Sequence, residues 1–268
     1  MRIICTGHRG FIGSHLYKEL SDNEVIGIDL VEDRDIRTLT PKDLEGVDFV
    51  FHLAARAKVP YSVDNPIDSH DHNVNGTLNL LWCAKEAGVK RVIYSASSSA
   101  YGDKTSLPLR ESMKPNPMSP YGLQKLVGEQ YCRIFSELYG LETVSLRYFN
   151  VYGNEMPLDG AYSACLAIFL DKRRKGEPLP VLGGKQTRDF TFVGDVVKAN
   201  LLAPKSNKVG KGEVINIGGG RNYSIDEIAK AISDNIKHFP QRKGEPMNTL
   251  ADISKAEKLL NWKPEVNL

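Results

Sequence analysis

The sequence lacks the features that mark several large classes of protein. Its four cysteines (Cys5, Cys83, Cys132 and Cys165) form no Cys-x-x-Cys pair, and no histidines stand at ligand spacing, which argues against a disulfide scaffold and a metal site. No apolar run approaches the roughly 18 residues needed to cross a bilayer. Basic residues number 35 and acidic residues 33, so no charge excess favours nucleic acid or an anionic membrane as partner.

The length and composition of the chain fit one large folded protein inside the cell. The 268 residues are 41% hydrophobic, enough to bury a core in one α/β domain with a smaller lobe. Scattered single cysteines are typical of reduced thiols. Met1 leads straight into an apolar run with no room for a signal peptide. We therefore expect a cytoplasmic protein.

Strand-like and helical runs alternate through the first 150 residues. Amphipathic stretches predict helices near 11–20, 66–87 and 120–139. This alternation indicates βαβ units and a Rossmann-type, doubly wound parallel sheet. The predicted strands are 2–6, 25–29, 48–54, 91–97 and 143–150.

After residue 150 the pattern loosens into shorter elements. Ser224 and Glu227 form a capping box that starts a helix. We expect an NAD-binding domain over 1–150 and a smaller substrate-binding lobe over 151–268, interleaved at an approximate boundary. The elements expected in the second part are helices at 160–175, 224–237 and 253–260, and strands at 179–182, 187–193 and 214–218.

A glycine-rich turn follows the first predicted strand. Gly7, Gly10 and Gly13 permit a tight turn and close approach to a pyrophosphate, and the following helix offers free amides. Asp29 ends the next strand, where an acid accepts hydrogen bonds from an unmodified adenosine ribose and repels a 2′-phosphate. The pattern predicts an NAD site. Asp35 and Ile36 could flank the adenine.

Tyr121 and Lys125 lie one turn apart on the predicted helix 120–139. Ser119 as N-cap, Pro120 at the first position and Gly140 beyond the end delimit this helix. An ammonium beside a phenol lowers the pKa of the phenol, so the pair can serve as a general base toward an alcohol. Helix starts of such folds face the ligand edge of the sheet.

With these features assembled, the chain resembles the extended short-chain dehydrogenase/reductase family, in its nucleotide-sugar epimerase/dehydratase branch and especially the UDP-glucose 4-epimerase-like enzymes. The similarity runs from Met1 to the end. It is carried by the glycine turn, Asp29, the Tyr121/Lys125 pair and further motifs. These begin at His52 (HLAA), Asn73 (NVNGT), Ser95 (SASSSAYG), Arg147 (RYFNVYG), Gln186 (QTRDF) and Ala251 (ADISKA).

The resemblance implies roles for the matching residues. Ser97 would act with Tyr121 and Lys125 in catalysis, and Asn150 would contact the sugar diphosphate. Arg188 and Arg242 would bind phosphate, although either could instead form a surface ion pair. NAD would contact Gly7, Gly10, Phe11, Ile12, Gly13, Asp29, Asp35, Ile36, Leu53, Ala54, Ala55, Asn73, Tyr121, Lys125 and Tyr148, and the sugar nucleotide would contact Ser97, Ser98, Asn150, Arg188, Arg242 and Thr249.

The resemblance implies a reaction that inverts C4 of a nucleotide sugar, and the residues just after Ser97 help to distinguish it from a dehydration. Dehydratases of the family carry an acidic pair just after the Ser97 position, and here Ser98 and Ser99 occupy it, which favours an epimerase. A 4-keto-sugar reductase or dehydratase and a non-catalytic NAD(H)-binding sensor remain as alternatives. The small Thr249 suggests that UDP-N-acetylglucosamine is accepted beside UDP-glucose, and a uronic acid substrate stays open.

The resemblance also bears on assembly and on length. In this family the helices that match 66–87 and 120–139 form a dimeric four-helix bundle, so we expect a homodimer. Its apolar candidates are Leu78, Leu81, Trp82, Leu126, Ile134, Phe135 and Leu138. The 29–52 stretch is short for the family, and the chain stops soon after Trp262, so we expect either a compact member or a truncated C-terminus.

Overall fold

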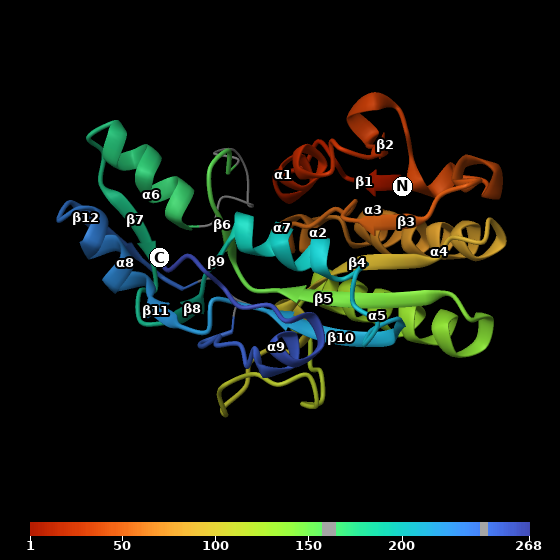
Figure 1. Ribbon diagram of the computed structural model, residues 1–268. Coiled ribbons are helices and arrows are strands. Elements are labelled where there is room, and N and C mark those ends of the chain that lie inside the picture. The colour runs from red at the N-terminus through yellow and green to blue at the C-terminus, as the bar shows by residue number, and fades with distance from the viewer. Residues whose placement is uncertain (157–164, 242–245) are drawn as a thin grey trace.

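The computed structural model describes residues 1–156, 165–241 and 246–268 and is built on one parallel sheet (Figure 1). The strand order is β2-β1-β3-β4-β5-β10, and every neighbouring pair is parallel. This confirms the doubly wound α/β prediction. The strands are β1 (Arg2–Thr6), β2 (Glu24–Ile28), β3 (Phe49–His52), β4 (Arg91–Ser97), β5 (Glu142–Tyr148) and β10 (Lys211–Ile217).

Helices cover both faces of the sheet, which is why the central strands read as unbroken apolar runs. On one face, α1 (Phe11–Glu19), α7 (Val193–Leu202) and α9 (Ser254–Leu260) enclose a core that includes the fully buried Trp262. On the other face, α4 (Gly76–Glu86) and α5 (Pro120–Tyr139) enclose a second core. The result is a three-layer domain.

The strand order reverses between β1 and β3, and this point positions the site. From β1 the chain moves outward to β2, and it then returns to β3 and continues in the opposite direction through β4 and β5 to β10. The loops that follow β1 and β3 therefore run in opposite directions at the carboxyl edge of the sheet. Open α/β sheets bind their ligands at such a switch point.

A smaller lobe stands beyond that edge, at the left of Figure 1. It has its own core, built around Phe169, Val181 and Phe190. The lobe uses short strand pairs instead of a continuous sheet. Its elements are α6 (Cys165–Arg174), α8 (Ile225–Ile232), the parallel pair β7 (Leu179–Leu182) and β12 (Ile236–Phe239), the antiparallel pair β8 (Thr187–Asp189) and β11 (Asn222–Ser224), and the parallel pair β6 (Val151–Tyr152) and β9 (Thr191–Phe192).

Between β3 and α4 the chain forms a series of short helices. These are α2 (Val59–Asp64), α3 (Pro66–His70) and a π-helical turn, Asp71–Asn75, that runs into α4. The predicted helix 66–87 is therefore interrupted by one wide turn, a feature found mostly at functional sites. Between β2 and β3 there are only 3₁₀ turns, at Leu30–Glu32, Ile36–Thr38 and Pro41–Leu44, in agreement with the short stretch in the sequence.

Several expectations for the second half were wrong. The helix predicted over 224–237 ends at Ile232, because Ser233 is extended and its Oγ accepts the Asn235 N–H at 3.1 Å; residues 236–239 then form β12. The strand predicted over 187–193 is split into β8 and β9, and α7, which was not predicted, begins at Val193. The strand predicted at 214–218 is β10 and joins the central sheet. The first five residues of the helix predicted at 160–175 lie outside the described residues.

No helix in the described part of the chain is both long and apolar enough to cross a membrane.

Candidate active site

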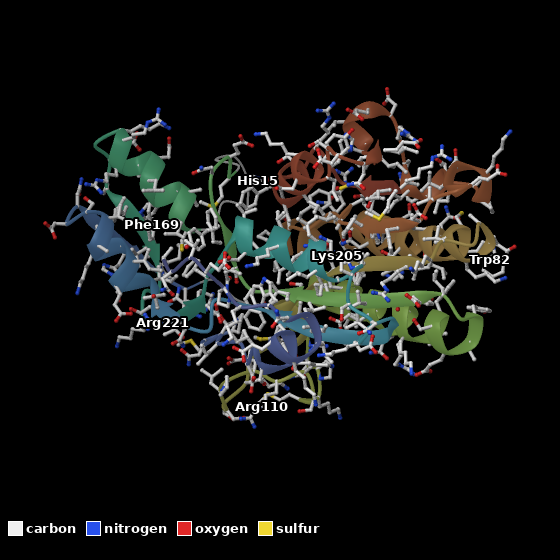
Figure 2. All side chains as sticks on the ribbon, viewed as in Figure 1. His15, Trp82, Arg110, Phe169, Lys205 and Arg221 are labelled. Atoms are coloured by element: carbon white, nitrogen blue, oxygen red, sulfur yellow. The ribbon has the colours of Figure 1, made fainter. Side chains whose placement is uncertain are left out.

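A cavity of about 1650 Å³ opens at the carboxyl edge of the sheet and is lined by both lobes. A pocket for one drug-sized ligand measures roughly 300–1,000 Å³, so this cavity has room for two such ligands. Figure 2 labels a lining residue on each side, His15 of α1 and Phe169 of α6. The cavity therefore lies between the switch point and the smaller lobe.

The glycine turn forms one wall of this cavity. Gly7 has φ +70°, and a Cβ there would lie 2.6 Å from the Ala54 nitrogen. A Cβ on Gly13 would lie 2.0 Å from the Gly7 carbonyl oxygen. Only glycine allows this packing of turn, strand and helix. The turn leads into α1, whose first amides have no partner within the helix and can bind phosphate oxygens.

Asp29 lies behind the turn instead of on the cavity wall. Its carboxylate accepts the Arg9 N–H at 3.0 Å and the Val31 N–H at 3.2 Å, and it is absent from the lining of the cavity in the described chain. The contact with Arg9 connects the end of β2 to the glycine turn, so the two predicted parts of the adenosine site lie side by side.

The start of α5 carries the predicted base. Ser119 caps the helix by accepting the Gly122 N–H at 3.1 Å, and Gly140 ends it in a left-handed conformation. The Tyr121 N–H donates to Ser62 Oγ of α2 at 3.0 Å, and Lys125 Nζ donates to the Ser95 carbonyl oxygen of β4 at 2.8 Å. Both Tyr121 and Lys125 line the cavity.

Burial dominates the titration of this pair. Burial raises the pKa of Tyr121 to about 12, and a hydrogen bond with Ser97 opposes that rise. Burial lowers the pKa of Lys125 to about 8, while nearby Cys132 and Glu129 oppose that fall. The expectation that Lys125 lowers the pKa of Tyr121 stays a prediction, and desolvation of the phenolate acts against that lowering.

Ser97 is oriented by its neighbour Ser99. Ser97 Oγ accepts the Ser99 hydroxyl at 2.8 Å and the Ser99 N–H at 3.2 Å. With two hydrogen bonds accepted, the Ser97 proton is directed elsewhere, and Tyr121 is its partner. The serines at 97, 98 and 99 all line the cavity, and none of them can act as an acid at neutral pH.

A second hydrogen-bonded chain supports the floor of the site. Thr77 Oγ1 donates to the Asn73 carbonyl oxygen at 2.6 Å, so it must accept from His52 Nε2 at 2.9 Å. His52 Nδ1 then accepts from Thr6 Oγ1 at 2.8 Å, and Thr6 accepts the Ala54 N–H at 3.1 Å. Burial lowers the pKa of His52 to about 3, so this histidine is neutral with one fixed tautomer.

The smaller lobe supplies the opposite wall. Asn150, with a φ of 21°, donates to the Asp189 carbonyl oxygen at 2.8 Å and to Thr249 Oγ1 at 3.5 Å. Arg188 Nη1 donates to the Thr187 carbonyl oxygen at 2.9 Å. Asn150, Arg188 and Thr249 all line the cavity. This wall joins the end of β5 to β8.

Most of the site residues predicted from the sequence meet at this cavity. Five lie off its lining in the described chain: Asp29, Asp35, Ile36, Ala54 and Asn73. Arg242 lies outside the described residues. The cavity brings together Gly7, Gly10, Phe11, Ile12, Gly13, Leu53, Ala55, Ser97, Ser98, Tyr121, Lys125, Tyr148, Asn150, Arg188 and Thr249.

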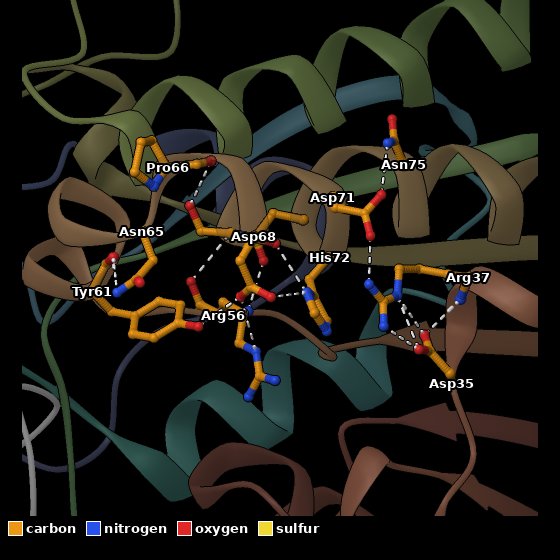
Figure 3. Close-up of polar contacts among 12 residues, drawn as sticks. Asp35, Arg37, Arg56, Tyr61, Asn65, Pro66, Asp68, Asp71, His72 and Asn75 are labelled. Carbon is orange, nitrogen blue, oxygen red and sulfur yellow. Dashed lines mark hydrogen bonds and ion pairs between the residues drawn. The ribbon is translucent and has the colours of Figure 1, made fainter.

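Two of the residues off the lining have other partners. Figure 3 shows Asp35 bound by Arg37, which also pairs with Asp71 of the π-helical turn. Asn73 of the same turn accepts the Arg56 N–H at 2.7 Å and donates to the Arg56 carbonyl oxygen at 3.1 Å. Asn73 therefore fixes the backbone of the loop that follows β3, one step behind the cavity wall.

The predicted set leaves out several parts of the cavity wall, among them α2, α6 and two residues of the glycine turn. Val59, Pro60, Val63 and Asp64 of α2 line the cavity, but the segment is too short to show a helical period. His8 and Arg9 of the glycine turn also line the cavity. The signal for Arg9 is a basic side chain inside a turn whose glycines predict phosphate binding.

Comparisons with known proteins agree with this geometry. A model of the NAD dependent epimerase/dehydratase family matches residues 3–218. A UDP-N-acetylglucosamine 4-epimerase from Methanobrevibacter ruminantium M1, solved with UDP-N-acetylmuramic acid, is 35% identical with a TM-score of 0.93, covering 98% of this chain and 93% of its own. The UDP-glucose 4-epimerase of Thermotoga maritima, solved with UDP-glucose, is 34% identical with a TM-score of 0.92, covering 100% and 94%. A UDP-glucuronate 4-epimerase from Thermodesulfobacterium geofontis is 36% identical, covering 90% and 74%.

Proposed function

The chain belongs to the NAD dependent epimerase/dehydratase family, and we propose that it is an NAD-dependent 4-epimerase of a UDP-linked sugar, acting through a 4-keto intermediate. One observation carries the proposal: Tyr121, Lys125 and Ser97 line one cavity with Ser98 and Ser99 at the positions where a dehydratase needs acids. A reactive triad without an adjacent acid suits oxidation and re-reduction at one carbon.

The residues present fit NAD. The glycines at 7 and 13 let the turn pack tightly against the Leu53–Ala54 backbone and the start of α1, and Asp29 stands at the end of β2 where the ribose of NAD is bound in this fold. Gly7, Gly10 and Gly13 with the start of α1 would hold the pyrophosphate, and Tyr148 and Lys125 would border the nicotinamide end. When bound, NAD would supply the hydride acceptor and donor for C4 of the sugar and, in its oxidised form, positive charge beside Tyr121.

The chain's own residues perform the proton transfers. Tyr121 Oη takes the proton of the 4-hydroxyl as C4 is oxidised and gives it back when the ketone is reduced. Ser97 orients that hydroxyl, with its own oxygen held by Ser99 at 2.8 Å. Lys125, anchored to the Ser95 carbonyl oxygen at 2.8 Å, keeps a cation beside the phenol. Inversion requires the 4-keto sugar to turn over between the two hydride transfers, for which a cavity of about 1650 Å³ leaves room.

The sugar is chosen in part at Thr249. This side chain lines the cavity and is held by the Asp189 N–H at 3.1 Å. A residue as small as threonine leaves space for an N-acetyl group at C2, so we place UDP-N-acetylglucosamine beside UDP-glucose as substrates. Thr249→Tyr should then spare turnover of UDP-glucose and suppress the N-acetyl sugar. Equal loss of both activities would contradict this role.

We further propose a homodimer formed by α4 and α5. Leu81 and Phe135 pack into the core, but Trp82, Leu123 and Leu138 are exposed at 45%, 52% and 71%. Trp82 lies at the end of the molecule far from the smaller lobe (Figure 2). Such apolar exposure supports pairing with a second copy. Light scattering should give a dimer mass that Leu138→Lys reduces, whereas Leu170→Lys on the exposed side of α6 should leave the dimer intact.

The division into parts and the location also stand as proposals. We assign NAD binding to 1–150 and nucleotide-sugar binding to 151–268, with α7 and β10 returning to the first part. The buried thiols of Cys5, Cys83 and Cys132 support a reducing cytoplasm. Cell fractionation tests the location.

The decisive experiment follows the sugar directly. The purified protein is incubated without added cofactor with UDP-glucose, UDP-galactose, their N-acetyl forms and UDP-glucuronate, and proton NMR follows the anomeric and H4 signals. We expect interconversion at C4, abolished by Tyr121→Phe and retained by Tyr131→Phe, a matched change on the same helix outside the cavity lining. Loss of the H4 signal with formation of a 6-deoxy product would indicate a dehydratase. NAD binding without conversion of any sugar would indicate a sensor.

A further inference from the structure

Arg9 stands where a phosphate-binding cation would stand. Its backbone N–H donates to Asp29 Oδ2 at 3.0 Å, and its side chain lines the cavity and is 60% exposed. In dinucleotide-binding folds an acid at the end of the second strand binds the 2′-hydroxyl of NAD, and an arginine nearby accommodates the 2′-phosphate of NADP. This turn therefore holds the determinants of both cofactors next to each other.

Glu32 binds the guanidinium of Arg9. Glu32 Oε1 accepts Arg9 Nε at 2.6 Å and also contacts Arg9 Nη2. Its other oxygen lies 3.3 Å from His8 Nε2. The hydrogen bond from Arg9 holds the pKa of Glu32 below its usual range, so the carboxylate is charged at neutral pH. The other cation of this segment, Arg34, donates from Nη1 to the Gly27 carbonyl oxygen at 2.7 Å and points back to the strand.

We propose that Glu32 is a cofactor-specificity residue: by binding the Arg9 guanidinium it denies NADP the cation that would bind its 2′-phosphate. The inference rests on the proposed function, because it takes NAD to bind at the glycine turn. Asp29 contributes repulsion of the phosphate, and Glu32 adds a second negative charge and occupies the neutralising arginine. Selection of NAD then depends on two acids, of which the sequence pattern reveals only one.

The pair can be opened without disturbing the fold. Glu32 is the last residue of a 3₁₀ turn on the surface, and ion pairs between exposed side chains add little to stability. A guanidinium released from Glu32 can instead bind a phosphate through short, charge-assisted hydrogen bonds. Glu32→Gln keeps the size of the side chain and removes its charge, so we expect NADP affinity to rise roughly tenfold. NAD affinity should change by less than about threefold, because NAD has no 2′-phosphate.

The test is titration of the purified protein, after removal of any nucleotide that it carries, with NAD and with NADP, read by calorimetry, for the wild type and three variants. Glu32→Gln should lower the NADP-to-NAD ratio of Kd values about tenfold. The double variant Glu32→Gln/Arg9→Ala should lose that gain. Glu24→Gln is the matched control: it removes one negative charge from the start of β2, where Glu24 is 68% exposed and pairs with Arg2 at 3.0 Å, and it should leave the ratio unchanged.

The outcomes separate this inference from the proposed function. An unchanged ratio in a Glu32→Gln protein that binds NAD would overturn the inference and leave the epimerase proposal standing. A gain that persists without Arg9, or that Glu24→Gln reproduces, would also overturn it, because general charge and not the guanidinium would be responsible. Failure of the wild-type protein to bind NAD would overturn both. Raising the salt concentration should reduce the gain, since exposed charges are screened.

Discussion

His52 should make the protein lose stability in mild acid. The side chain is buried, its pKa is lowered to about 3 by burial, and its two ring nitrogens are committed to Thr6 and Thr77 in one tautomer. An unfolded chain binds a proton on this histidine near pH 6.5. As the pH falls, the unfolded state is therefore protonated first and the folded state loses stability.

The magnitude follows from the gap between the two pKa values. Each pH unit below 6.5 costs about 1.36 kcal/mol until the folded pKa near 3 is reached. At pH 5 the loss at this single site is about 2 kcal/mol, and at pH 4 it is about 3 kcal/mol. Against a total stability of roughly 5–15 kcal/mol this is a large fraction. Above pH 7 the site adds no further pH dependence.

The assay compares the wild type with His52→Gln by urea unfolding between pH 4 and pH 7. Fluorescence of the fully buried Trp262 reports unfolding. Carboxyl groups also titrate over this range, so only the difference between the two curves isolates His52. Glutamine can still donate to Thr77, and we expect the variant to be less stable at pH 7 yet to lose about 2 kcal/mol less between pH 7 and pH 5. Parallel curves would refute the reasoning.

Two further predictions concern the buried side of α5. Arg147→Met should destabilise the fold by about 3–5 kcal/mol, because Glu129 is fully buried and Arg147 Nε lies 2.7 Å from its Oε1. In urea unfolding, adding Glu129→Gln to this variant should recover much of the lost stability. A cost below about 1 kcal/mol for Arg147→Met alone would contradict a buried ion pair. Ser62→Ala removes the acceptor of the Tyr121 N–H and should lower kcat roughly tenfold through misplacement of the base. Ser69 accepts a hydrogen bond from Gln124 of α5, so Ser69→Ala is the control and should lower stability without that loss of kcat. Equal loss of kcat in the two variants would contradict the role of Ser62 in placing Tyr121.

The sheet and the catalytic helix could be predicted because their signals are local. Parallel strands buried on both faces read as apolar runs, and α5 carries a cap, a first-position proline and a terminal glycine within its own sequence. The glycine turn likewise specifies its own conformation, as the contact between Gly13 and the Gly7 oxygen requires. Prediction and structure agree for elements whose conformation is determined by their own residues.

The rest could not be predicted because it depends on distant partners. The six residues of α2 have no period of their own, and Ser62 connects them to α5 by accepting the N–H of Tyr121, 59 positions away. The strand β12 begins after a polar stretch that reads as the end of a helix, and only its parallel partner β7 makes it a strand. The second half of the chain likewise returns to the first through β10, which pairs with β5.

At Tyr121, a local contact predicted from the sequence and burial in the fold act on the pKa in opposite directions. One turn of helix places an ammonium beside Tyr121, and that contact alone would lower the pKa of the phenol. Folding also removes water from both groups, and each is driven toward its neutral form: the phenol toward a pKa of about 12 and the ammonium toward about 8. At neutral pH the protein's own groups therefore keep the proton on Tyr121. Only the phenolate can accept a substrate proton, so positive charge brought by a bound cofactor would favour proton transfer in an occupied site.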